Sequence, residues 1–188
     1  MSEAPAAGQI ADLSRRLRRV DLLLLRAVVR QRARPSVAQK GQYWGQYITD
    51  DEVDGILRAH GEIDLPLSVG LASVDEELDR TLPLRDAPAP GSRVDRLAAA
   101  FDLDGDDLDL LLLALAPEIS SGYGRILAWL HDDVGRPWLS VDLATRILRP
   151  DRPGRLDLQN RLLPGGALVQ HRLVVLTPEP GRGPHGQR

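Results

Sequence analysis

The chain of 188 residues is 43% hydrophobic and has a formal net charge of −3 at pH 7. This length suits one domain, or one domain with an appendage, and the apolar fraction is large enough for a packed core. Cysteine is absent, which excludes disulfides, thiol catalysis and cysteine-ligated zinc. Aromatic residues make up only 4%, so the core must consist mainly of aliphatic side chains, the usual filling between packed helices.

The charges are unevenly distributed along the chain. Residues 1–40 carry +6, residues 41–110 carry −12 and residues 111–188 carry +3. Segregation of this kind favours docking between oppositely charged parts of the chain, or binding of a charged partner.

The sequence has no recognisable targeting or membrane-spanning segment. Its first ten residues lack the basic start and apolar run of a signal peptide. No apolar stretch approaches the roughly 20 residues that a membrane span requires. We therefore expect a soluble, cytoplasmic protein that has no membrane partner.

A single long helix is predicted over residues 9–33, which contain no proline or glycine. One side is apolar and the opposite side carries arginines. We expect that arginine side to be solvated, and not to bind nucleic acid or membrane, because the acidic middle block supplies a counter-charge. A second apolar strip must be covered by the acidic block, by another copy of the chain or by a partner. This strip consists of Leu22, Leu25 and Val29.

Candidate partner-binding residues lie on this helix and among the tryptophans. On the helix they are the strip residues and the neighbouring Arg26. Trp44 stands in an aromatic loop that is either an exposed binding patch or a loop anchored on the core. Trp129 is the remaining candidate. The full set is Leu22, Leu25, Arg26, Val29, Trp44 and Trp129.

Two short helices follow. A capping box of Thr49 and Glu52 predicts a helix over residues 50–59, and Ser73 with Glu76 predicts another over residues 74–82. Several prolines and a glycine follow between residues 83 and 91, which is the composition of a linker. We therefore predict an N-terminal helical extension over residues 1–88 and a second domain over residues 89–177.

The second domain begins with four helices. Their predicted N-caps are Ser92, Asp104, Ser120 or Ser121, and Ser140. The central helix starts near Gly105 and is expected to end at Pro117. Because leucine covers most of its circumference, we expect it to be buried on nearly all sides.

After Pro150 the signals change. Residues 167–176 are rich in β-branched residues, and Pro164, Gly165 and Gly166 form a turn signal. These features predict a strand, paired with residues 156–163 as a β-hairpin, although helix remains an alternative for residues 155–163. Helices followed by a terminal hairpin are the order of a winged helix. The tail, residues 178–188, is expected to be disordered or to mark the edge of a longer protein.

Motifs for catalysis, metals and cofactors are absent or incomplete. The run Asp102 to Asp106 resembles a calcium loop, but leucine stands where that loop requires its bidentate glutamate, and helix capping explains the same aspartates. The four histidines stand at no metal-ligand spacing. There is no phosphate-binding G-x-x-x-x-G-K-[ST] sequence and no nucleophile elbow. We expect no cofactor, no metal and no enzymatic activity.

Several ordered segments carry a family resemblance: LDLLLLALAPE (108–118), YGRILAWLHDDV (123–134) and RPWLSVDLA (136–144), flanked by QYITDDEVD (46–54) and LVQHRL (168–173). Together they resemble the variant winged-helix region at the N-terminus of bacterial AAA+ ATPases, which often accompany contractile, phage-tail-like injection systems. In that family the ATPase core follows on the C-terminal side. The resemblance implies an accessory domain, and the nucleotide chemistry of the family falls on none of the residues present.

These observations predict a mainly α fold: a winged-helix-like domain with a small C-terminal β-hairpin and an N-terminal long-helix extension. The predicted function is a non-catalytic protein-interaction domain of an AAA+ ATPase. Its partner would be another protein or the ATPase core of the same protein, with a homo-oligomer as an open alternative. The competing hypothesis is a DNA-binding regulator, but residues 123–134 and 140–149 carry few arginines for a recognition helix. We expect no specific nucleic-acid binding.

Overall fold

The computed structural model describes residues 4–33, 48–60, 69–86 and 92–178. In these ranges the chain forms nine α-helices and no β-strand. The helices are α1 (Ala4–Arg32), α2 (Asp50–Ala59), α3 (Leu71–Asp86), α4 (Arg93–Phe101), α5 (Gly105–Ile119), α6 (Ser121–His131), α7 (Val141–Leu148), α8 (Arg152–Arg161) and α9 (Ala167–Gln170). The prediction of a mainly α fold is confirmed, and the predicted bounds of α2 are matched.

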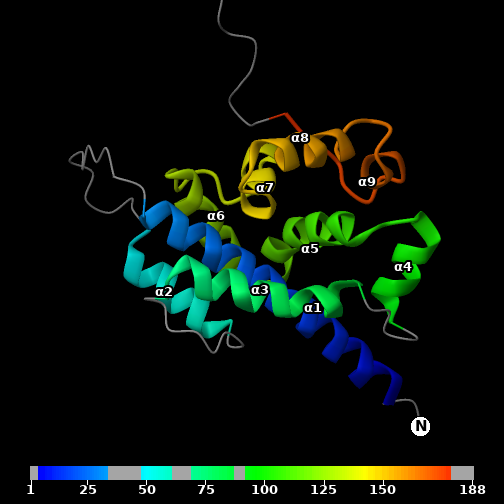
Figure 1. The fold of residues 1–188 in the computed structure, drawn as a ribbon, viewed down its shortest axis with the longest axis horizontal. Coiled ribbons are helices and arrows are strands. Elements are labelled where there is room, and N and C mark those ends of the chain that lie inside the picture. The colour runs from blue at the N-terminus through cyan, green and yellow to red at the C-terminus, as the bar shows by residue number, and fades with distance from the viewer. Residues whose placement is uncertain (1–3, 34–47, 61–68, 87–91, 179–188) are drawn as a thin grey trace, which may run out of the picture.

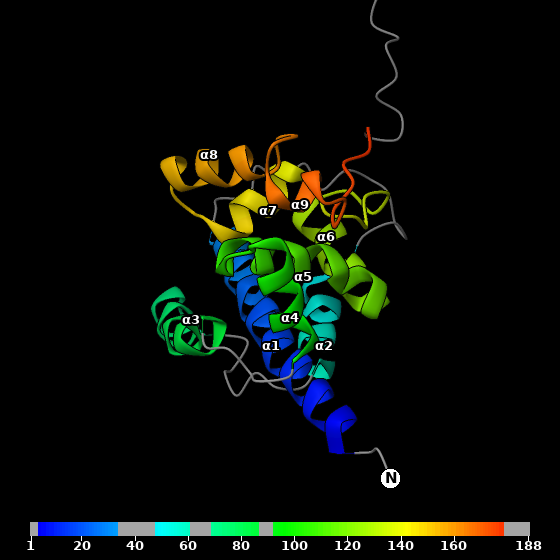
Figure 2. The same ribbon diagram turned by 90° about the vertical axis from the view of Figure 1, so that its right-hand side faces the viewer.

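Helix α1, 29 residues long, is the axis of the molecule (Figures 1 and 2). It packs against α3, α5, α6 and α7. Both views place α8 beyond α5 and α7, and α9 beyond α5, on the side away from α3, and both show the N-terminal turns of α1 extending past the other helices. Accordingly Ile10, in these turns, is 67% exposed.

The most deeply buried stretch is the middle of α1. Val20, Leu22–Leu25 and Val28 are each at most 1% exposed. Four consecutive buried leucines point in all directions around a helix, so they require neighbours on every side. The packing partners of α1 meet this requirement. The middle of α1 is therefore buried on all sides, a burial that was predicted for α5 alone.

Helix α5 differs from the prediction in two ways. Its start is as predicted, since Asp104 and Asp107 form a reciprocal capping box. It does not end at Pro117, because a proline removes only one helical hydrogen bond, and the N–H of Ser120 still donates to the carbonyl of Ala116 at 3.1 Å. The predicted burial on nearly all sides holds over most of residues 107–113, but not at Leu115, which is 41% exposed.

The predicted C-terminal β-hairpin is wrong. Asp151 caps the first turn of α8 through the N–H of Gly154, and Pro153 stands at the start of that helix, where its missing N–H costs nothing. In the second half of the predicted hairpin, Leu168 is buried in the short helix α9. Arg172 then adopts a left-handed backbone conformation, with a φ of 55°, which interrupts any strand through this run.

One hydrophobic core cluster contains buried residues of α1, α2 and α3 together with residues of α5 to α9. The segments predicted as extension and second domain thus share apolar packing. The proposed boundary near residue 88 lies outside the described residues, as do Trp44 and residues 179–188 of the predicted tail. Within the described part of the chain, no single helix is both long enough and apolar enough to cross a membrane, while the bent pair of α5 and α6, at 113°, passes by length and composition.

Candidate functional site

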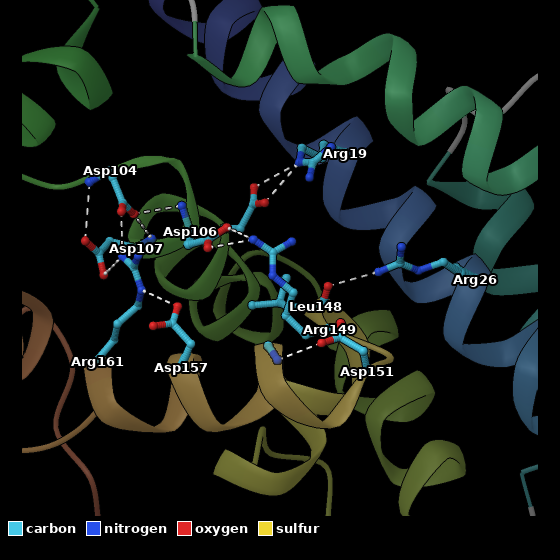
Figure 3. Close-up of polar contacts among 12 residues, drawn as sticks. Arg19, Arg26, Asp104, Asp106, Asp107, Leu148, Arg149, Asp151, Asp157 and Arg161 are labelled. Atoms are coloured by element: carbon cyan, nitrogen blue, oxygen red, sulfur yellow. Dashed lines mark hydrogen bonds and ion pairs between the residues drawn. The ribbon is translucent and has the colours of Figure 1, made fainter.

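The arginines of α1 are engaged inside the molecule. Arg19 donates from Nε to both carboxylate oxygens of Asp109 at 3.1 Å (Figure 3). Its Nη1 donates to the hydroxyl of Thr81 at 2.6 Å and to the carbonyl of Leu78 at 3.3 Å. The Arg19 and Asp109 side chains are only 10% and 6% exposed. The expectation of a solvated arginine side is therefore wrong at this position, because α3 and α5 place acceptors over it.

A second buried network joins α1 to the start of α4. Asp12 accepts hydrogen bonds from Ser92, Arg15 and Arg16, and Arg16 also pairs with Asp95 at 2.6 Å. Burial alone would raise the pKa of Asp12, but the hydrogen bonds from the serine and the two arginines outweigh it and hold this pKa below its ordinary value. Both networks tie α1 to acidic residues of the middle block, which is the internal docking that the charge segregation suggested.

Arg26, predicted to bind a partner, instead covers the C-terminal end of α7. Its Nη2 donates to the carbonyls of Ile147 at 2.7 Å and Leu148 at 3.2 Å, and its Nη1 lies 3.4 Å from Asp75 (Figure 3). A cation at this position satisfies terminal carbonyls and matches the helix dipole. Burial lowers the pKa of the guanidinium.

The other described residues that were predicted to bind a partner differ from one another in burial. Leu22 and Leu25 are fully buried, so they cannot reach a partner in this structure. Val29 is half-buried against the core. Trp129 is also half-buried, and the Arg32 guanidinium lies 5.7 Å from its ring centre. The structure does not bring these residues together into one exposed surface.

A cluster of carboxylates at the N-terminus of α5 holds the basic residues that follow α7. Arg149 binds both oxygens of Asp106 at 2.7 and 2.8 Å, and Arg161 donates to Asp104 at 2.6 Å (Figure 3). Arg161 also lies 3.4 Å from Asp107, whose pKa is raised by burial. These pairs fasten α8 across α5, in the place where the hairpin was predicted.

The two helices predicted as candidate recognition helices expose little basic surface. Helix α7 buries Leu143, Ala144, Thr145, Ile147 and Leu148 out of eight residues. Its outward pair, Asp142 and Arg146, is an ion pair of opposite charges at 2.9 Å. On α6, Arg125 pairs with Glu52 of α2.

A cleft of about 830 Å³ opens between α5, the segment before α7, α7 itself and the chain after α9. The residues at its walls that bear on recognition are Arg136, Trp138, Asp142, Arg146 and the run Val174–Pro178. This cleft was not predicted, because residues 174–176 were expected to form part of a hairpin. Residues 174–176 are apolar and lack helical periodicity, which was the available sign of an exposed apolar segment outside a helix. Val175 is in fact 70% exposed.

A polar cluster around His60 connects α2 with α1 and α6. The His60 ring stacks on Tyr123 with 4.1 Å between ring centres, and its Nε2 lies 3.3 Å from the hydroxyl of Ser120. Its Nδ1 lies 3.7 Å from a carboxylate oxygen of Asp21, which already accepts the O–H of Tyr123 at 2.7 Å. Burial and this carboxylate raise the pKa of Tyr123. The Ser120 hydroxyl is also engaged in capping α6, where it accepts the N–H of Gly122 at 3.3 Å, and we assign the cluster a packing role.

We expect His60 to make the fold sensitive to acid. Burial lowers its pKa below the ordinary value of 6.5, so the unfolded chain takes up this proton at a higher pH than the folded chain does. The free energy of unfolding should therefore fall as the pH drops below about 6.5. Thermal melts of the parent and His60→Gln at about pH 7.5 and about pH 5.5 measure this, and the variant should lose less of its melting temperature. The control is His171→Gln at an exposed histidine. An equal loss in the parent and both variants would contradict the assignment.

Among the described residues, no group of three or more histidine, aspartate or glutamate side chains is placed to hold a metal ion. The carboxylates of the rejected calcium loop serve other purposes, since Asp104 caps α5 and Asp102 ends α4 in a left-handed conformation.

A comparison with protein families gives one finding about the whole chain. The family model described as "Winged helix domain, variant" matches residues 9–188. No curated protein and no solved structure gives a match. The described part places a long helix and a group of short helices around one core, with α8 and α9 where a hairpin was expected. The chain belongs to the variant winged helix domain family.

Proposed function

We propose that this chain is a non-catalytic domain that binds protein, and that it is not a sequence-specific DNA-binding regulator. The observation that carries the proposal is the burial of α7. A recognition helix must present several side chains to the base edges of the major groove. Helix α7 turns five of its eight residues into the core and presents an oppositely charged pair, Asp142 and Arg146, at its surface.

The electrostatics of neighbouring helices support the same proposal. Binding to DNA depends strongly on arginine and lysine side chains that neutralise phosphates. Arg149 and Arg161 are held by the carboxylates of α5, and Arg19 is buried against Asp109. Pairing to DNA phosphates would require breaking these contacts and leaving the carboxylates near the phosphates.

We propose further that this domain is an accessory domain of an AAA+ ATPase. Its support is the resemblance of residues 108–144 to the region that precedes the ATPase core in those proteins. On this proposal the chain docks either a substrate protein or neighbouring subunits, works in the cytoplasm, and requires no cofactor of its own.

We expect no tight binding of this chain to duplex DNA. Labelled duplexes of random and genomic sequence are titrated with the protein at physiological salt, and binding is followed by fluorescence anisotropy. The dissociation constant should be weaker than about 1 μM, and any residual binding should be removed by unlabelled competitor, because the outward surfaces of α6 and α7 are nearly neutral. Submicromolar binding that survives competitor would overturn the proposal in favour of the DNA-binding regulator.

The ATPase link is tested with the AAA+ module encoded nearest to this chain in its genome. The purified module and this chain are mixed, and complex formation is measured by size-exclusion chromatography with light scattering. The proposal expects a complex or a changed rate of ATP hydrolysis by the module, and no hydrolysis by this chain alone. If neither effect occurs, the accessory role is rejected and the broader protein-binding role remains to be judged by its own partners.

A further inference from the structure

We propose that the 830 Å³ cleft beside α7 binds an extended peptide segment of a partner protein that carries alternating apolar and acidic side chains. This inference rests on the proposed protein-binding function and assigns it a site. The lining residues that define the cleft are Arg136, Trp138, Asp142, Arg146 and the wall Val174–Pro178.

The first argument concerns the backbone of the wall. Five consecutive residues, Val174–Pro178, line the cleft without helical structure, so the chain runs along one side of it. The N–H of Val174 donates to the carbonyl of Leu168. Beyond that point, the backbone groups of residues 175–177 make no hydrogen bond to the backbone of any described residue. A chain edge of this kind can pair with an added strand, which is a recurring mode of peptide recognition.

The second argument concerns apolar surface. Val175 is 70% exposed and Leu176 is 48% exposed, and both line the cleft. Trp138 and Leu139 also line it and contribute apolar surface. A strand paired with residues 175–177 would place alternate side chains against this surface. The volume of the cleft falls within the range of specific binding sites in proteins.

The third argument concerns charge. The cleft is lined by two arginines, Arg136 and Arg146, and by a single carboxylate, Asp142. Arg146 pairs with Asp142 one helical turn away, but the Asp142 side chain is 73% exposed. Such a pair contributes little in water, so a peptide carboxylate can compete for the guanidinium. The charge of the lining therefore favours an acidic segment over a basic one.

The test uses three labelled heptapeptides in which glutamate alternates with leucine or valine. The first is unmodified, the second has lysine in place of each glutamate, and the third repeats the first with methylated backbone nitrogens. Each is titrated with the intact chain by fluorescence anisotropy. The unmodified acidic peptide should bind with a dissociation constant below about 1 mM, and the lysine and N-methylated peptides should bind at least about tenfold more weakly.

Two variants of the cleft and two matched controls locate the site. Val175→Ser should weaken binding of the acidic peptide about tenfold, and Arg146→Gln about threefold. The controls make comparable changes on α8, outside the cleft: Leu156→Ser, at an aliphatic side chain that is 54% exposed, and Arg152→Gln, at an exposed arginine. These controls should leave the affinity unchanged. Amide hydrogen exchange at residues 175–177 should slow when the acidic peptide is bound.

Any of three results would overturn the cleft assignment: no binding of the acidic peptide up to about 1 mM, equal binding of the lysine peptide, or equal effects of the cleft and control variants. These failures differ from failure of the proposed function. A chain that binds no acidic peptide but still forms a complex with a protein partner retains the function and loses this site. Tight binding of duplex DNA would remove the function itself.

Discussion

Asp109→Ala is expected to lower the free energy of unfolding by about 3 to 5 kcal/mol. The substitution leaves the guanidinium of Arg19 without its carboxylate, in a place where the side chain is only 10% exposed. The Thr81 hydroxyl and the Leu78 carbonyl remain beside Arg19, but neither carries a charge. Chemical denaturation followed by circular dichroism measures the change.

A double variant and a surface control distinguish two free energies: the destabilisation caused by an unpaired buried charge, and the net stabilisation by the ion pair. Arg19→Met with Asp109→Leu should recover most of the lost stability, because apolar residues of similar volume often replace a buried ion pair without loss. Thr81 supports this substitution, since its hydroxyl already donates to the Leu78 carbonyl at 2.6 Å. Arg80→Ala removes surface ion pairs to Glu76 and Glu77 in which the Arg80 side chain is 63% exposed, and it should change stability much less than Asp109→Ala does. If Asp109→Ala has an effect as small as Arg80→Ala, the pair does not hold α1 to α5.

Leu22→Glu is expected to abolish cooperative folding. Leu22 is fully buried in the middle of α1, and a carboxylate there has no water and must be protonated or expose the core. The expected loss of about 4 kcal/mol or more is a large part of the total stability of a small domain. The measurements are thermal melting by circular dichroism and the mass in solution by light scattering.

The matched control on the same helix is Ile10→Glu. Ile10 is 67% exposed in the projecting N-terminal turns, so the same chemical change should leave the melting temperature nearly unaltered. A Leu22→Glu variant that melted like the parent, but with a smaller mass in solution, would show that the strip of Leu22, Leu25 and Val29 contacts another copy of the chain. That outcome would restore the partner-binding interpretation of these residues.

Local signals in the sequence determined most helix starts. Thr49, Ser92, Asp104 and Ser140 cap the helices for which they were predicted. A cap acts through backbone groups two or three residues away, so it can be read without knowledge of the rest of the fold. Helix α8 also has a local start signal, formed by Asp151 and Pro153. The β-propensity of the residues that follow nevertheless led to the prediction of a hairpin there.

The all-helical end of the described chain was decided by tertiary contacts. Residues 167–176 are β-prone, but a strand needs a partner, and residues 152–161 form α8 instead of the partner strand. Arg149 and Arg161 bind carboxylates at the start of α5, which holds α8 across that helix. β-propensity reflects fit to a sheet more than an intrinsic backbone preference, so it could not decide this segment alone.

The sequence by itself determined the helical class, the segregation of charge and the absence of known catalytic motifs. Only the tertiary structure decided which faces of α1 meet a neighbour. It buried Leu22 and Leu25, turned Arg19 and Arg26 inward, and left Val175 exposed beside a cleft. The physical reason is that helical periodicity specifies which side chains share a face, whereas burial depends on what packs against that face. The carboxylates that pair with Arg19 and Arg26 lie 90 and 49 residues away in the chain.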